Sequence, residues 1–81
     1  MLYEALRHGQ SLISQGAHDA PQVRQAMLDC LAASAPAMQI EYLEVVDPST
    51  MTPLETISGP ALIAAAVWLG KTRLIDNLLC G

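Results

Sequence analysis

Basic residues are scarce in this sequence. Only four Lys and Arg occur among 81 residues, and the formal net charge is −4. A nucleic-acid-binding surface needs clustered Lys and Arg to displace counterions, and an anionic membrane surface attracts the same side chains. The composition therefore argues against both nucleic acid and membrane as partners.

Long apolar runs and a cysteine framework are also missing. No run approaches the roughly 18–20 residues that cross a bilayer, and no basic segment precedes an apolar one as in a signal peptide. The two cysteines form neither a disulfide framework nor a paired metal-ligand spacing. We expect Cys30 to act as a small buried hydrophobe on a helix and Cys80 to be exposed. A reducing, cytoplasmic compartment is expected.

Apolar residues are abundant, at 52% of the chain against 15% charged. A chain of this length forms one domain at most, and about 60–65% of its unfolded surface becomes buried on folding. Such an apolar composition also predicts that part of the folded surface is apolar and normally contacts something else.

The N-terminal segment predicts an amphipathic helix over about residues 2–15, because apolar residues recur at three- to four-residue spacing. Gly16 is expected to close it in the left-handed conformation. No capping residue precedes Leu2, which is typical of a domain taken from a longer polypeptide, with a genuine start at Met1 as the alternative.

A second helix is predicted after Asp19, which with Pro21 and Gln22 resembles a capping box. Pro36 is expected to end it. The residues that recur on its apolar face are Val23, Met27, Cys30, Leu31 and Ser34.

The rest of the chain predicts strands. Residues 39–46 alternate imperfectly between polar and apolar, residues 47–50 form a turn, and residues 61–69 and 73–79 are apolar runs flanking Gly70. Two helices followed by three strands predict an α+β domain, with two helices packed on a small three-stranded antiparallel sheet.

Gly70-Lys71-Thr72 matches the second half of a phosphate-binding loop, G-x-x-x-x-G-K-[ST]. The first glycine is replaced by Ala65, and too little chain follows Thr72 for the helix whose N-terminus would hold the phosphate. We therefore interpret the segment as a hairpin turn, with a small nucleotide binder as an alternative.

Chemistry-bearing residues are few. His8 and His18 have no third ligand at metal spacing, and Glu41 and Glu44 would project to opposite faces of a regular strand. Arg73 and Asp76 lie in an otherwise apolar strand. If buried they need partners, a cross-strand carboxylate for Arg73 and backbone N–H groups or a hydroxyl for Asp76. We interpret both as structural, and predict no catalytic, cofactor-binding or metal-binding residue in this chain.

Three segments resemble the pantothenate synthetases (pantoate–β-alanine ligases), in their C-terminal domain. Ile40-Glu41-Tyr42-Leu43-Glu44-Val45-Val46-Asp47-Pro48 is similar to a strand and turn of that domain. The Ala-rich run that ends at Gly70, followed by Thr72-Arg73-Leu74-Ile75-Asp76-Asn77, is similar to its last strands. Leu2-Tyr3-Glu4-Ala5-Leu6 looks like the end of its first helix, so the resemblance covers essentially the whole chain.

The resemblance implies an ATP- and magnesium-dependent ligase, cytoplasmic and homodimeric, that activates pantoate as an acyl-adenylate and joins it to β-alanine with release of AMP and pyrophosphate. The family's nucleotide-binding domain, with its His-containing signature and its pantoate-binding glutamines, is absent. Residues 1–81 therefore look like the C-terminal lid domain alone, partnered by the N-terminal catalytic domain and inactive by itself. The alternative is a stand-alone protein-interaction module without enzymatic activity.

Overall fold

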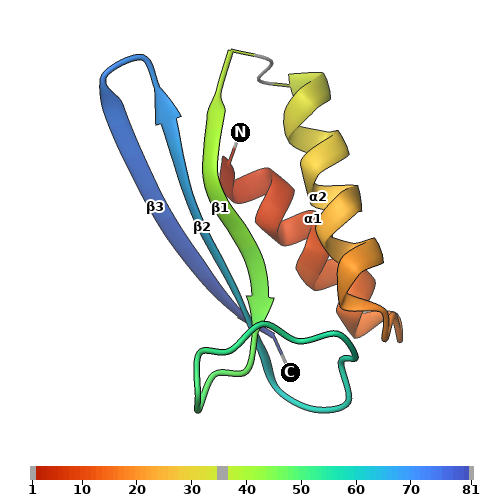
Figure 1. Ribbon diagram of the computed structural model, residues 1–81. Helices are drawn as coiled ribbons and strands as arrows, with labels where there is room; N and C mark the ends of the chain where they lie inside the picture. The colour runs from red at the N-terminus through yellow and green to blue at the C-terminus, as the bar shows by residue number, and fades with distance from the viewer. Residues whose placement is uncertain (1, 35–36, 81) are drawn as a thin grey trace.

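A computed structural model of the protein describes residues 2–34 and 37–80. Two helices, α1 (Leu2–Ser14) and α2 (Ala20–Ser34), precede three strands, β1 (Gln39–Val46), β2 (Ala61–Leu69) and β3 (Thr72–Cys80). The strands form an antiparallel sheet in the order β1-β2-β3. Both helices lie on one side of this sheet (Figure 1), α1 mainly against β3 and α2 against β1. The predicted α+β architecture is confirmed.

The helix ends follow the predicted signals. Gly16 has φ 100°; its N–H bonds to the carbonyl of Ile13 at 3.1 Å, and the N–H of Ala17 bonds to the carbonyl of Leu12 at 3.0 Å. This pair of bonds is the Schellman motif, which satisfies the last carbonyls of α1. At the start of α2, Asp19 Oδ1 accepts the N–H of Gln22 at 3.2 Å, as an N-cap does.

The apolar face of α2 was predicted with one error. Val23, Met27 and Leu31 are buried and Cys30 is partly buried, whereas Ser34 is exposed. Ser34 donates its hydroxyl to the carbonyl of Cys30 at 2.8 Å, which satisfies the side chain without burial. The predicted stop at Pro36 lies outside the described residues.

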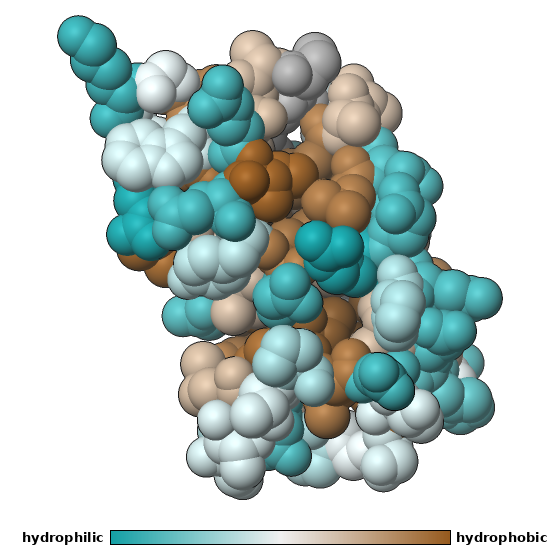
Figure 2. Space-filling model, viewed as in Figure 1, coloured by the Kyte–Doolittle hydropathy of each residue, from teal (hydrophilic) through white to brown (hydrophobic). Residues whose placement is uncertain are grey.

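The core fills the space between helices and sheet. Apolar residues also reach the surface: Figure 2 shows them in a band down the middle of the view, with polar residues on both flanks. Gly9 allows a close approach here: a Cβ at this position would lie 2.4 Å from Met27 Sδ and 3.1 Å from Ile63 Cδ1. The glycine therefore lets α1 pack tightly against α2 and β2. The largest fully buried side chains are Leu6, Val23, Met27, Leu31, Leu43, Ile63, Val67 and Cys80.

The burial of Cys80 corrects the sequence prediction that it is exposed. Its place in β3 opposite Ala61 turns the thiol toward the helices, where only 2% of the residue is accessible. Burial raises the pKa of this thiol. Nearness to the end of the chain did not predict exposure, because strand pairing continues to Cys80.

The long connection between β1 and β2 is held to the link between the two helices. The N–H of Ile57 bonds to the carbonyl of His18 at 2.7 Å, and the N–H of Ala20 bonds to the carbonyl of Glu55 at 3.0 Å. Asp47 Oδ1 accepts the N–H of Ser49 at 2.7 Å, which closes the predicted turn over residues 47–50. These bonds tie the loop to the α1–α2 link and position the start of β2.

Candidate functional site

Residues 69–72 form a two-residue β-hairpin turn. Leu69 pairs with Thr72, Gly70 has φ 62°, and Lys71 keeps a negative φ. A positive φ at the first central residue only is the pattern of a type II′ hairpin turn, which places Gly there. The hairpin prediction is confirmed: the segment is strand–turn–strand, and a phosphate loop requires strand–loop–helix.

Arg73 is held by a carboxylate from the far edge of the sheet. Its Nε donates to Glu41 Oε1 at 3.0 Å and its Nη2 to Oε2 at 2.8 Å, a bidentate pair. The indole Nε1 of Trp68 donates to the same Oε1 at 2.9 Å. A cross-strand carboxylate was the partner predicted for Arg73, although the guanidinium is partly exposed rather than buried.

These bonds fix the charge of the cluster formed by Glu41, Trp68 and Arg73. The guanidinium hydrogen bond from Arg73, followed by the indole hydrogen bond, lowers the pKa of Glu41 below its ordinary value of 4.5. The bond to Glu41 in turn raises the pKa of Arg73. Both groups are therefore charged at neutral pH. A carboxylate engaged by three donors is a poor general base, so the geometry favours a positioning role.

A β-bulge at Glu41 makes this arrangement possible and corrects a second prediction. The register shifts between Ile40 and Tyr42, and Glu44 then pairs with Ala64. Because the extra residue reverses the alternation, Glu41 and Glu44 both lie on the sheet face away from the helices, whereas a regular strand places them on opposite faces. Nothing in the sequence of residues 39–46 signalled the bulge, and the role of Trp68 was missed with it.

Glu44 and Asp76 have separate partners. Glu44 Oε1 lies 3.8 Å from Arg24 Nε of α2, and the same Nε donates to the carbonyl of Leu43 at 2.6 Å. Asp76 Oδ1 accepts the N–H of Asn77 at 2.9 Å, the backbone partner predicted for it. Asp76 pairs with Ala65 and therefore lies on the helix-covered face. The structure does not bring Asp76 and Arg73 together.

The histidines lie apart from this cluster. His8 is exposed on α1, and His18 lies in the link before α2. Among residues 2–34 and 37–80, no group of three or more His, Cys, Asp or Glu is placed to hold a metal ion. In the same ranges, neither helix, of 13 and 15 residues, has the length and apolarity to cross a bilayer.

An open concavity of about 1060 Å³ lies at the other end of the sheet from the hairpin. Its walls come from the second half of α1, residues 16–18, residues 56–60 and Cys80. Among the described residues, the lining includes Arg7 and His18 but no Asp or Glu side chain. It does not include the Glu41–Arg73–Trp68 cluster.

The sequence matches the family model described as pantoate-beta-alanine ligase over residues 1–79. The chain belongs to the pantoate-beta-alanine ligase family. It is 45% identical over 76 residues to the pantothenate synthetase of Desulfovibrio desulfuricans, covering 94% of this chain and 27% of that protein. It is 45% identical over 78 residues to the pantothenate synthetase of Moorella thermoacetica, covering 96% of this chain and again 27% of that protein.

A solved relative in this family has the same fold. The crystal structure of pantothenate synthetase from Thermus thermophilus superimposes with a TM-score of 0.85 at 31% sequence identity, covering 95% of this chain and 27% of that one. The chain thus spans about a quarter of the length of the relatives it matches. It corresponds to a domain-sized part of a pantoate-beta-alanine ligase.

Proposed function

We propose that residues 1–81 are the C-terminal lid domain of a cytoplasmic, homodimeric ligase that joins pantoate and β-alanine to form pantothenate. The intact enzyme uses ATP to make a pantoyl-adenylate, which the amine of β-alanine attacks with release of AMP. The observation that supports this most is the family match over residues 1–79, together with coverage of only about 27% of each pantothenate synthetase.

The described residues do not fit the ATP and magnesium that this reaction requires. They hold no cluster of carboxylates and histidines for a metal ion, and Gly70-Lys71 forms a tight hairpin turn rather than a loop that surrounds phosphate. In this proposal both belong to the larger, N-terminal part of the enzyme, and the 81-residue chain is inactive alone.

The physical role of a lid is to exclude water. An acyl-adenylate hydrolyses if solvent reaches it, and a second domain that closes over it protects the intermediate until the amine arrives. A rigid sheet backed by two helices is suited to this role, because it can move as one body.

The test is domain replacement in the Desulfovibrio desulfuricans enzyme. Residues 1–79 replace the matching segment, and AMP formation from ATP, pantoate and β-alanine is measured for the parent enzyme, the hybrid, the enzyme lacking this segment and the 81-residue chain. We expect the hybrid to retain activity within about tenfold of the parent, and the last two proteins to show none.

Two results would contradict the proposal. Turnover by the 81-residue chain would show that it contains an active site. A hybrid that folds, by circular dichroism and gel filtration, but forms no AMP would show that the chain does not serve as this domain. In the second case a stand-alone interaction module becomes the better interpretation.

A further inference from the structure

The face of the sheet away from the helices is uncovered. Along β2, Ile63, Ala65 and Val67 belong to the core cluster shared with the helices, so the alternate residues turn the other way. The cross-strand register adds the neighbours of those alternate residues on β1 and β3. We call the apolar part of this surface the open face: Tyr42, Leu62, Ala64, Ala66, Trp68, Ile75 and Leu79.

The open face exposes large apolar side chains in two groups, which the row formed by Glu44, Ala64 and Asn77 separates. Ile75 is 56% exposed and Leu79 62%, and Tyr42 and Trp68 each keep more than a third of their surface accessible. Exposed aromatic and aliphatic side chains on one side of a sheet are typical of a surface that meets another protein surface.

The charged groups on this side of the sheet are already paired, whereas the amides of Gln39, opposite Trp68, and Asn77, opposite Ala64, lie on the same side. Glu41 accepts hydrogen bonds from Arg73 and Trp68 at one end, and Glu44 lies beside Arg24 at the outer edge of β1. Burial of an unpaired charge is costly, whereas a bidentate pair carries its partner with it. The face can therefore dock against an apolar surface without leaving these charges unmatched.

The likeness to longer relatives points to what covers this face. The pantothenate synthetases of Desulfovibrio desulfuricans and Thermus thermophilus are about three and a half times its length, so each contains a large second part. A partner in the same polypeptide has an effective concentration in the millimolar range, which two separate molecules rarely reach. Two copies of this chain would also each bring a net charge of −4 to the contact.

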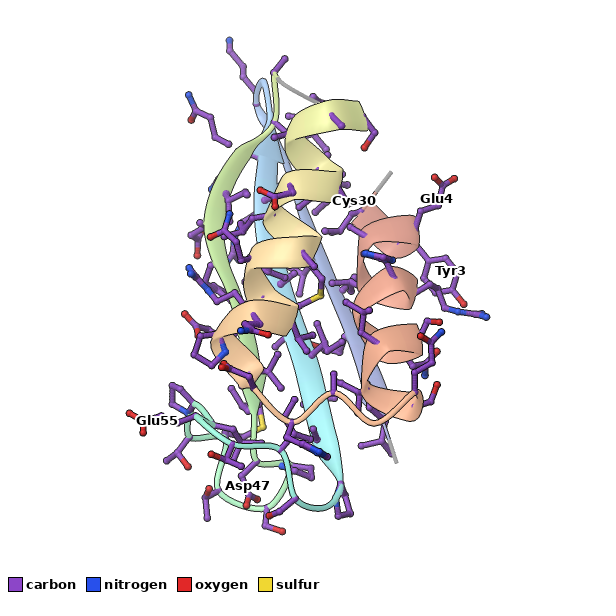
Figure 3. All side chains as sticks on the ribbon, turned by 90° about the vertical axis from the view of Figure 1, so that its right-hand side faces the viewer. Tyr3, Glu4, Cys30, Asp47 and Glu55 are labelled. Carbon is purple, nitrogen blue, oxygen red and sulfur yellow. The ribbon has the colours of Figure 1, made fainter. Side chains whose placement is uncertain are left out.

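We propose that the open face is the surface through which this domain rests on the larger part of the enzyme. This inference depends on the proposed function, and it identifies which of the two sides of the lid faces the other domain. The helices then form the outer, solvent-facing layer, where Tyr3 and Glu4 point outward from α1 (Figure 3).

Hydroxyl-radical footprinting read by mass spectrometry tests the docking directly. Oxidation rates of individual side chains are compared between the 81-residue chain and the Desulfovibrio hybrid described above. We expect Tyr42, Trp68 and Leu79 to react at least about fivefold more slowly in the hybrid, because docking excludes water from a buried contact. Tyr3 and Met51, exposed elsewhere on the domain, serve as internal controls and should keep their rates.

A matched pair of substitutions in the hybrid gives an independent readout. Ile75→Asp places a charge on the open face, and Tyr3→Asp places one at a similarly exposed position on α1. We expect Ile75→Asp to lower AMP formation at least about tenfold and Tyr3→Asp to change it less than about twofold. Circular dichroism of the same variants in the 81-residue chain separates loss of docking from loss of folding. Should Ile75→Asp not fold, Leu79→Asp replaces it.

The outcomes separate the two proposals. An active hybrid whose open-face residues oxidise as fast as in the free chain would overturn the docking surface and leave the proposed function standing. An inactive but folded hybrid would remove the proposed function and this inference with it. Protection of the open face that rises with the concentration of the 81-residue chain alone would assign the face to a second copy, and would also overturn the inference.

Discussion

The two faces of the central strand β2 differ in what covers them. Ile63, Ala65 and Val67 are completely buried, because the helices cover this side of the sheet (Figure 1). On the other face, Ala64 and Ala66 are buried only by side chains from the neighbouring strands, and Trp68 remains partly exposed. One face is therefore covered within this chain except near the hairpin, where Ile40 and Leu74, both opposite Val67, remain more than a third exposed. The other is apolar without a cover of its own.

The two faces contribute unequally to the stability of the domain. Burial of the helix-covered face supplies the stability of an 81-residue chain, about 4–12 kcal/mol for a domain of this size. The open face contributes less to that total, since Ile75 and Leu79 remain more than half exposed and Tyr42 and Trp68 more than a third. Its apolar composition then needs an explanation other than folding, and the proposed contact with the larger part of a pantoate-beta-alanine ligase would provide one.

The largest expected difference in stability is between Ile63→Ala, on the helix-covered face, and Ile75→Ala, on the open face. Ile63→Ala removes a fully buried side chain and is expected to cost about 2–5 kcal/mol. Ile75→Ala removes a side chain that is mostly exposed, and should cost less than about 1 kcal/mol. Urea denaturation of both variants of the 81-residue chain measures the difference.

If Ile63→Ala leaves no folded protein, Ile63→Val gives a measurable loss of about 0.5–1.5 kcal/mol. Equal losses at positions 63 and 75 would contradict the view that only one face forms the core.

The sequence predicted the helix-covered side well, because its signals are local. Gly16 and Asp19 mark helix ends through hydrogen bonds within a few residues, and the apolar spacing of α2 follows one turn of the helix. Gly70 marks the hairpin for the same reason, since a type II′ turn requires a positive φ at that position. The fold class and all five elements could be predicted from such signals.

The open face could not be predicted because it depends on register. The bulge at Glu41 inserts one residue into β1 and moves this side chain beside Trp68 and Arg73, which are 27 and 32 residues away in sequence. No local pattern specifies that alignment. The burial of Cys80 was missed for a related reason, since it follows from pairing with Ala61 across the sheet.

Acid should weaken the open face before the core. The pKa of Glu41 is lower in the folded chain than its ordinary value of 4.5, so its bonds to Arg73 and Trp68 stabilise the fold above pH 4.5. That contribution is lost as pH falls below 4.5 through the folded-state pKa. An NMR titration of the Glu41 carboxyl measures its pKa in the folded chain. The indole N–H signal of Trp68 should shift over the same pH range.

Arg73→Met removes the strongest cause of the lowered pKa and should move the Glu41 titration up toward 4.5. Arg24→Met, at the other carboxylate of this face, is the matched control and should leave the Glu41 titration unchanged. A Glu41 pKa that does not respond to Arg73→Met would mean that the bidentate pair does not form in solution.

The smallest perturbation compares two adjacent residues at the end of β3. Cys80 turns toward the helices and its pKa is raised by burial, whereas Leu79 turns to the open face and is mostly exposed. Since the thiolate is the reactive form, Cys80 should react with Ellman's reagent at least about 100-fold more slowly than a cysteine placed at position 79. The reaction of Cys80 is measured in the variant Cys30→Ala. The reaction of a cysteine at position 79 is measured in the variant Cys30→Ala/Leu79→Cys/Cys80→Ala.

The same two thiols are then compared in the Desulfovibrio hybrid, from which the cysteines of the larger part have been removed. There the thiol at position 79 should also react slowly, and the rate of Cys80 should be unchanged. A thiol at 79 that stays fast there would place the end of β3 outside the interdomain contact and confine docking to the half of the open face near Trp68.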